Sequence, residues 1–259
     1  MRAGSVILGL LAITTLTSGC KLENGWGVAF SQSSGEEEDG TGAGSMDGIW
    51  TGTLTLEGAA AGDSATAVLW EGELVVVSAG ADAAYAGGLS RTADSGEDPV
   101  ALEGDFRAYS AVGEAQGAGS VSATVAPEEE LTATVTGTER DGDLDLGPAD
   151  AFEESVSLED LTGTWSQTRD GGTLSLSVNS LGSVTGSGAD GCSYQGDLEA
   201  LSDAPNLFRL ALTVELCNAD NGDYAGYAYL DAATSPDTLR LLTEREERDR
   251  FLGLAPTRD

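Results

Sequence analysis

Apolar and polar residues alternate with a period of two along much of the chain after residue 46. The clearest example is 208–216, where every second residue from Phe208 to Leu216 is apolar. This alternation predicts a strand that buries one face and exposes the other. Asn221-Gly222 is a strong hairpin signal just beyond it, so we expect 224–230 to return as the neighbouring strand.

Short strands separated by turn residues are expected throughout this part of the chain. Glu71-Gly72-Glu73 is expected to bend or split one of them, and Leu158 to Leu161 predicts a single helical turn. No stretch has the apolar periodicity of a long amphipathic helix. Many short strands predict an all-β barrel or sandwich. The expected strands are 49–56, 66–78, 83–91, 101–110, 118–126, 130–138, 142–147, 173–178, 208–216, 224–230, 239–243 and 251–254.

The strands fall into two units of similar length, 46–150 and 153–259. Each unit opens with the same pattern, Gly48-Ile49-Trp50 in the first and Gly163-Thr164-Trp165 in the second. A repeat of this kind predicts a duplicated domain, although two such short matches can also arise by chance. We therefore expect two small antiparallel β-barrels in tandem.

The first twenty residues have the features of an export signal. Arg2 supplies a positive charge, 6–16 is an apolar run too short to span a bilayer, and Ser18-Gly19 precedes Cys20. The pattern resembles the lipobox of bacterial lipoproteins, although Thr17 stands where leucine is usual. The resemblance implies that 1–19 is removed and that acyl chains on Cys20 anchor the protein in the bilayer. The alternative is an ordinary secretory signal with a chance cysteine.

The segment 20–45 is expected to be a flexible tether. It is rich in Gly, Ser and Thr, and it contains the acidic run 36–39. Such a composition buries too little apolar surface to fold. Lys21 follows the cysteine in place of the aspartate that resembles an inner-membrane retention signal. The expected location is therefore the cell envelope, with the outer membrane favoured over the inner one.

The charge of the chain is strongly negative. There are 44 acidic and 12 basic residues, the net charge is −32, Lys21 is the single lysine, and there is no histidine. This composition resembles that of proteins from salt-loving organisms, in which carboxylates keep the surface hydrated. The alternative is an acidic surface that binds cations or a basic partner. Nucleic acids and anionic lipid headgroups are poor partners for such a surface, because their negative charge repels it.

The three cysteines predict one disulfide. If Cys20 is acylated, Cys192 and Cys217 remain as a pair in an exported protein. Cys217 is out of phase with the apolar face of 208–216, so the two sulfurs can meet only if a bulge or the end of that strand turns Cys217 round. A metal site at these cysteines would lack histidine and a second cysteine pair.

The Gly-x-Trp motif at the head of each unit resembles the first-strand motif of lipocalins and the wider calycin group. In that group the tryptophan plugs one end of a barrel, and an arginine near the last strand packs over it. The resemblance implies that Arg258 packs on Trp165 and Arg140 on Trp50, and it implies ligand binding. The alternative for both tryptophans is plain core packing.

The sequence contains no Gly-x-Ser-x-Gly elbow, no P-loop and no Gly-x-Gly-x-x-Gly motif followed by a helix. The absence of histidine excludes imidazole-assisted nucleophiles and histidine-bound zinc or haem. The alternating aspartates of 141–145 are similar to the start of a calcium-binding loop, but no loop glycine and no glutamate at the twelfth position follow in register. We therefore interpret this run as a strand whose acidic side chains face water. We expect no enzyme activity, no cofactor and no metal.

Two hypotheses for the function remain. The first is a structural or macromolecule-binding lipoprotein, with an envelope protein as partner; small β-barrel lipoproteins that inhibit lysozyme are analogous. The second is a carrier for a small apolar ligand. The candidate surface for either is a set of tyrosines in the second unit, and small barrels filled by their own side chains favour the first hypothesis. These tyrosines are Tyr194, Tyr224, Tyr227 and Tyr229.

Overall fold

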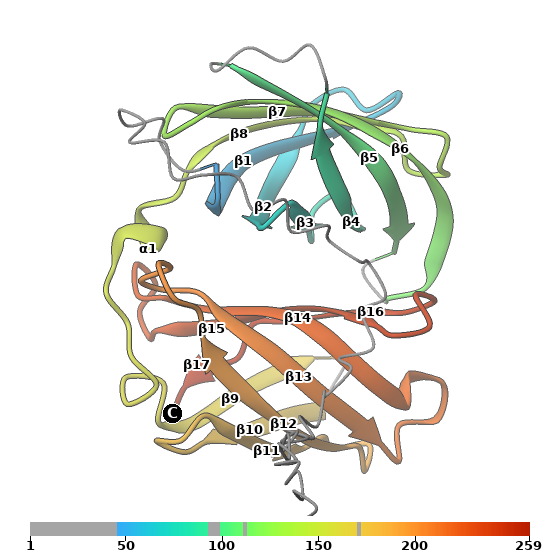
Figure 1. Cartoon of the computed structure of the whole chain (residues 1–259). Coiled ribbons are helices and arrows are strands. Elements are labelled where there is room, and N and C mark those ends of the chain that lie inside the picture. Colours follow the sequence, from blue (N-terminus) through green and yellow to red (C-terminus); the bar gives the residue numbers. More distant parts are fainter. Residues whose placement is uncertain (1–45, 93–98, 111–112, 170–171) are drawn as a thin grey trace, which may run out of the picture. The chain divides into compact units, whose positions relative to one another are not determined.

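The chain folds as two antiparallel β-barrels, one after the other in sequence (Figure 1). The structure, a computed structural model, describes residues 46–92, 99–110, 113–169 and 172–259. The expected signal peptide 1–19, Cys20 and the tether 20–45 lie outside the described residues. The all-β prediction and the tandem arrangement are confirmed.

The first barrel is a closed ring of eight strands in sequence order. Each strand pairs with the next, and the ring closes where β1 pairs with β8, with Trp50 opposite Pro148. The strands are β1 (Gly48–Leu56), β2 (Asp63–Trp70), β3 (Glu73–Ser78), β4 (Ala83–Arg91), β5 (Val100–Tyr109), β6 (Ala115–Ala126), β7 (Glu130–Thr136) and β8 (Gly142–Pro148).

The expected break in 66–78 is a tight hairpin between β2 and β3. Glu71 and Gly72 have φ angles of 49° and 81°. Two successive residues with positive φ match the right-handed twist of the flanking strands, which is why such turns are preferred in hairpins. One apolar run therefore supplies two neighbouring strands of the ring.

Large side chains fill the first barrel. Tyr85 stacks on Phe106 with ring centroids 6.4 Å apart, and the Tyr85 hydroxyl donates to the Arg140 carbonyl at 2.5 Å. Small residues allow the strands around these rings to approach closely: a Cβ on Gly104 would lie 1.8 Å from the Gly88 carbonyl oxygen. The other large interior side chains are Trp50, Leu54, Leu69, Leu74, Leu131 and Leu146, each no more than 2% exposed.

The second barrel closes in the same way, but its last strand is in two pieces. β16 and β17 both pair with β15, and β17 closes the ring by pairing Arg258 with Trp165 of β9. The strands are β9 (Gly163–Arg169), β10 (Gly172–Val178), β11 (Ser183–Ser187), β12 (Ser193–Ala200), β13 (Phe208–Glu215), β14 (Gly222–Asp231), β15 (Thr238–Arg245), β16 (Phe251–Leu254) and β17 (Thr257–Arg258).

The segment between the barrels holds the short helix α1 (Asp150–Glu153). The helical turn expected at Leu158 to Leu161 is instead a pair of tight turns, closed by N–H donation from Asp160 to Ser157 at 3.1 Å and from Thr162 to Glu159 at 3.1 Å. The turns place the Leu161 carbonyl 2.9 Å from the indole nitrogen of Trp165, which donates to it.

The two barrels belong to one compact unit and share an apolar cluster. Tyr227 on β14 lies in this cluster, and its hydroxyl donates to the Glu73 carboxylate of β3 at 2.6 Å. The first barrel contributes Ile49, Val68, Trp70, Val75, Ala84, Ala86 and Tyr109; the second contributes Ala204, Leu207, Tyr227, Tyr229, Leu242 and Phe251.

A buried carboxyl lies at the edge of this cluster. Glu244 on β15 is 3% exposed, accepts a short hydrogen bond from the Tyr109 hydroxyl, and accepts another from Arg248 Nε at 3.2 Å. Burial raises the pKa of Glu244, and these hydrogen bonds offset only part of the rise. The structure therefore favours the protonated form of Glu244 more than the unfolded chain does.

The free energy of unfolding depends on pH because proton binding to Glu244 is linked to folding. A carboxyl with a raised pKa in the folded state stabilises the fold most below its unfolded pKa, and this contribution is lost as the pH rises through the folded pKa. We expect Glu244→Gln to gain stability relative to wild type as the pH rises from about 4 to about 7. Chemical denaturation across this range measures the difference.

Glu246→Gln is the matched control, because Glu246 is exposed in the next turn. Its stability relative to wild type should stay nearly constant over the same pH range. If the two substitutions give the same pH profile, titration of Glu244 is not linked to folding.

Candidate functional site

One end of the second barrel is closed by a tryptophan and an arginine. Trp165 is fully buried, and the Arg258 guanidinium carbon lies 4.3 Å from the centre of its ring. Arg258 also donates to the carbonyls of Asp160 at 2.6 Å and Thr162 at 3.2 Å. The structure thus brings together the two residues that the lipocalin resemblance pairs, and the turn before β9 fixes both of them.

The equivalent pairing in the first barrel is wrong. Arg140 lies in the turn between β7 and β8, beside the Leu56 end of β1, whereas Trp50 lies at the other end of β1, opposite Pro148. Arg140 instead forms an ion pair with Asp82 at 3.1 Å. The sequence could not show the error, because an arginine near the last strand can lie at either end of a barrel.

The other end of the second barrel opens into a cavity of about 410 Å³. Successive turns of an antiparallel ring alternate between its two ends, so the turns after β9, β11, β13 and β15 meet at one end. The cavity lies there, opposite Trp165. Its lining residues are Gln167, Gly172, Thr173, Leu174, Gly188, Ala189, Asp190, Tyr194, Val214, Cys217, Asp220, Tyr224 and residues 251–254.

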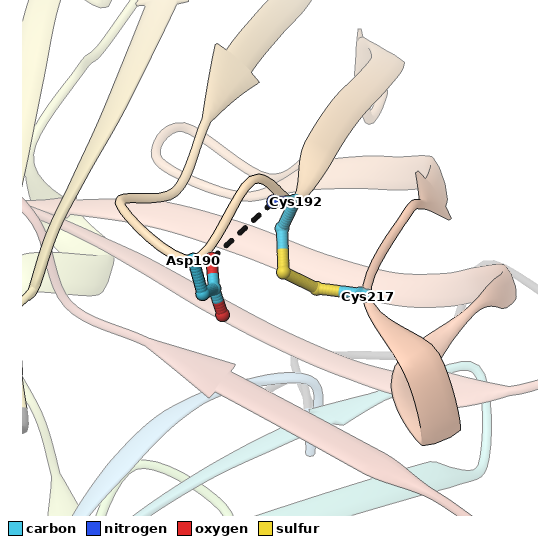
Figure 2. A group of neighbouring side chains, drawn as sticks. All are labelled: Asp190, Cys192 and Cys217. Carbon is cyan, nitrogen blue, oxygen red and sulfur yellow. Dashed lines mark hydrogen bonds between the residues drawn. A yellow bond between two sulfur atoms is a disulfide. The ribbon is translucent and has the colours of Figure 1, made fainter.

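A disulfide between Cys192 and Cys217 borders this cavity (Figure 2). β13 ends at Glu215, and Leu216 adopts a φ of 60° that turns Cys217 back toward Cys192. This resolves the phase difference seen in the sequence. The prediction that Leu216 continues the buried face is wrong for the same reason, because its side chain is 74% exposed.

Asp190 lies beside the disulfide, as Figure 2 shows. One of its carboxylate oxygens accepts the N–H of Cys192 at 3.3 Å, and ligand atoms of Asp190, Cys192 and Cys217 lie within 4.8 Å of one another. Cysteine binds metals as a thiolate, and a sulfur in a disulfide bond is not a thiolate. With the disulfide formed, this group is therefore an acidic rim and not a set of metal ligands.

The four candidate tyrosines do not form one surface. Tyr194 and Tyr224 line the cavity. Tyr227 and Tyr229 lie in the apolar cluster between the barrels. The period-two rule contains the signal for this division, because Tyr224 and Tyr227 are an odd number of residues apart on one strand and must face opposite sides.

The rim of the cavity is acidic. Burial raises the pKa of Tyr194, and burial also raises that of Tyr224 to about 12, so both phenols are neutral at pH 7. The Asp220 carboxylate lies 3.7 Å from Arg250 Nε, whereas Asp190 makes no ion pair with any residue that the structure describes. The sequence analysis did not identify either aspartate as a site residue. Both lie in turns at the same end of the ring, and a strand count from the sequence would have indicated this.

Comparison of the chain with protein families, with curated proteins and with solved structures finds no match. No helix in the described part of the chain has the length and apolar character needed to span a bilayer. The structure establishes two eight-stranded antiparallel barrels, and the comparisons assign them to no family.

Removing the disulfide should destabilise the second barrel. The bond closes a loop across a sequence separation of 25. In the chain-entropy model such a closure stabilises the fold by roughly 3.5 kcal/mol. We expect Cys192→Ser/Cys217→Ser to lose about this amount in chemical denaturation. A reductant should lower the stability of wild type and leave the variant unchanged; equal sensitivity of the two proteins would contradict the assignment.

Proposed function

We propose that the second barrel binds a small molecule at its open end, within a lipid-anchored binding protein of the bacterial envelope. The observation that carries the proposal is the cavity opposite the Trp165–Arg258 plug. A closed end and an open end give an eight-stranded barrel the shape of a cup, and barrels of this strand number have room for one small ligand.

The size and lining of the cavity support this function. Its volume of about 410 Å³ lies within the range of small-molecule sites. Leu174, Val214 and Leu254 give it apolar walls, while the tyrosine hydroxyls and two carboxylates supply polar groups near the mouth. A mixed lining of this kind suits a small amphipathic molecule.

The first barrel is a poor candidate for the ligand site. Tyr85 and Phe106 cross its interior and are at most 2% exposed. A ligand would have to displace these rings from a packed core. The role that suits the first barrel is to support the second through the shared apolar cluster.

The structure weakens the first hypothesis from the sequence, macromolecule binding, because two of the four candidate surface tyrosines are buried. Tyr227 and Tyr229 are at most 3% exposed, and both are packed against the other barrel. They are therefore not available to an envelope partner. Small-molecule binding retains Tyr194 and Tyr224, both of which line the cavity.

The membrane anchor rests on the lipobox-like sequence before Cys20. We expect wild type to incorporate a radiolabelled fatty acid in a bacterial host and to begin at Cys20 after processing, because the lipidated cysteine becomes the first residue. Cys20→Ser should incorporate no label, whereas Cys192→Ser/Cys217→Ser should be labelled like wild type. A mature protein that begins elsewhere and carries no label would contradict the anchor.

The ligand site can be tested by filling the cavity. Val214 is buried and lines the cavity, so Val214→Phe places additional atoms in it. We expect the neutral fluorophore N-phenyl-1-naphthylamine to bind wild type saturably and to bind Val214→Phe roughly tenfold more weakly, because the larger side chain occupies space the ligand needs and small changes in the volume of an apolar pocket alter affinity on this scale. The readout is energy transfer from tryptophan.

The protein for this titration is residues 20–259 with Cys20→Ser, purified in high salt, so that no acyl chain competes for the fluorophore. Ala211→Phe is the matched control, because Ala211 is exposed on the outer face of the same strand. Absence of saturable binding to a cooperatively folded wild type, or equal weakening by both substitutions, would rule out this site.

A further inference from the structure

We infer that the ligand of the second barrel is an organic cation, a compact apolar body that carries an ammonium group. The inference rests on the proposed function and adds the chemical class of the ligand. It follows from the carboxylates in the cavity lining, the aromatic rings in its wall and the partners of Arg245 and Arg250.

The described lining of the cavity holds two carboxylates, and Arg250 pairs with one of them, Asp220. Asp190 and Asp220 belong to this lining, and no arginine or lysine does among the residues that the structure describes. Asp190 is exposed at the rim, and the N–H of Cys192 holds its carboxylate at 3.3 Å. A positive group entering the mouth would therefore meet the Asp190 carboxylate, which forms no ion pair with the side chains that the structure describes.

Two arginines at the turn after β15 are committed to other groups. Arg245 donates to the carbonyls of Ala219 at 2.9 Å and Asn221 at 2.8 Å. Arg250 lies between Glu114, at 3.3 Å, and Asp220, at 3.7 Å. Both cations thus bind the turns at this end of the barrel, and neither belongs to the described lining of the cavity.

Two aromatic rings complete the site. Tyr194 and Tyr224 line the cavity, with the Tyr194 hydroxyl 3.9 Å from Cys217 Sγ and the Tyr224 hydroxyl donating to the Asp220 carbonyl at 2.9 Å. Both hydroxyls therefore point toward the turns at the mouth. The face of a neutral phenol ring attracts cations, and this attraction is strongest where water is excluded. An ammonium group beside these rings would also lie near the acidic rim, while its apolar body would contact Leu174 and Val214.

The test compares three ligands of similar size that differ in charge. Benzyltrimethylammonium is the cation, neopentylbenzene is its neutral carbon isostere, and phenylacetate is an anion. Binding to residues 20–259 with Cys20→Ser is measured by ligand-observed NMR at low and high salt. We expect the cation to bind more tightly than the isostere, phenylacetate not to bind, and the preference for the cation to shrink as salt increases.

Substitutions at Asp190 and Tyr194 test whether the cavity rim causes the preference for the cation. Asp190→Asn should reduce the ratio of cation to isostere affinity about threefold, the scale of an exposed ion pair. Glu199→Gln removes the same charge from the exposed outer face of β12 and should leave the ratio unchanged. Tyr194→Leu keeps an apolar wall but removes a ring, so it should weaken binding of the cation more than binding of the isostere.

The outcomes separate the inference from the proposed function. If the isostere binds as tightly as the cation, the cavity binds small molecules but the charge assignment is wrong. If Asp190→Asn and Glu199→Gln lower the ratio equally, the preference arises from the overall charge of the protein and not from the rim, and the inference also fails. If neither ligand nor the neutral fluorophore binds a folded protein, the proposed function fails and the inference fails with it.

Discussion

Each barrel depends on the backbone pairing that closes its ring. A sheet closed on itself has no unpaired edge, and its strand number sets the width of the interior. With eight strands that interior is just wide enough for side chains to fill. The identity of a few inward-facing residues then decides whether a barrel is solid or has a hollow end.

The two barrels resolve this constraint differently. In the first, Tyr85 and Phe106 span the interior, and the strands approach closely around them at small residues. In the second, the largest buried side chain, Trp165, lies at one end, and the turns at the opposite end border a cavity. A common architecture thus gives one barrel a packed core and the other a cup with an acidic, aromatic rim.

Much of the fold could be predicted because alternation along a strand records which face is buried. The first barrel follows the expected strands, including the break at Glu71-Gly72. Strands β11 and β12 were not predicted, since polar residues and glycine leave them little apolar alternation.

The candidate site was harder to predict. Periodicity indicates a face but not an end of the barrel, so it cannot show that Arg140 and Trp50 lie at opposite ends. The turn that reverses Cys217 depends on backbone conformation, with positive φ at Leu216 and Asn218, and periodicity does not report this.

Closing a ring by pairing its first strand with its last also has a kinetic consequence. Trp50 pairs with Pro148, and Trp165 pairs with Arg258, so the final contacts of each barrel join segments far apart in sequence. Folds of such high contact order form slowly, because loop-closure entropy is lost before the pairing compensates for it. Until closure, bare strand edges can template aggregation. A net charge of −32 on every copy opposes the approach of two incompletely folded chains, so the acidic composition protects the protein during the interval before its rings close.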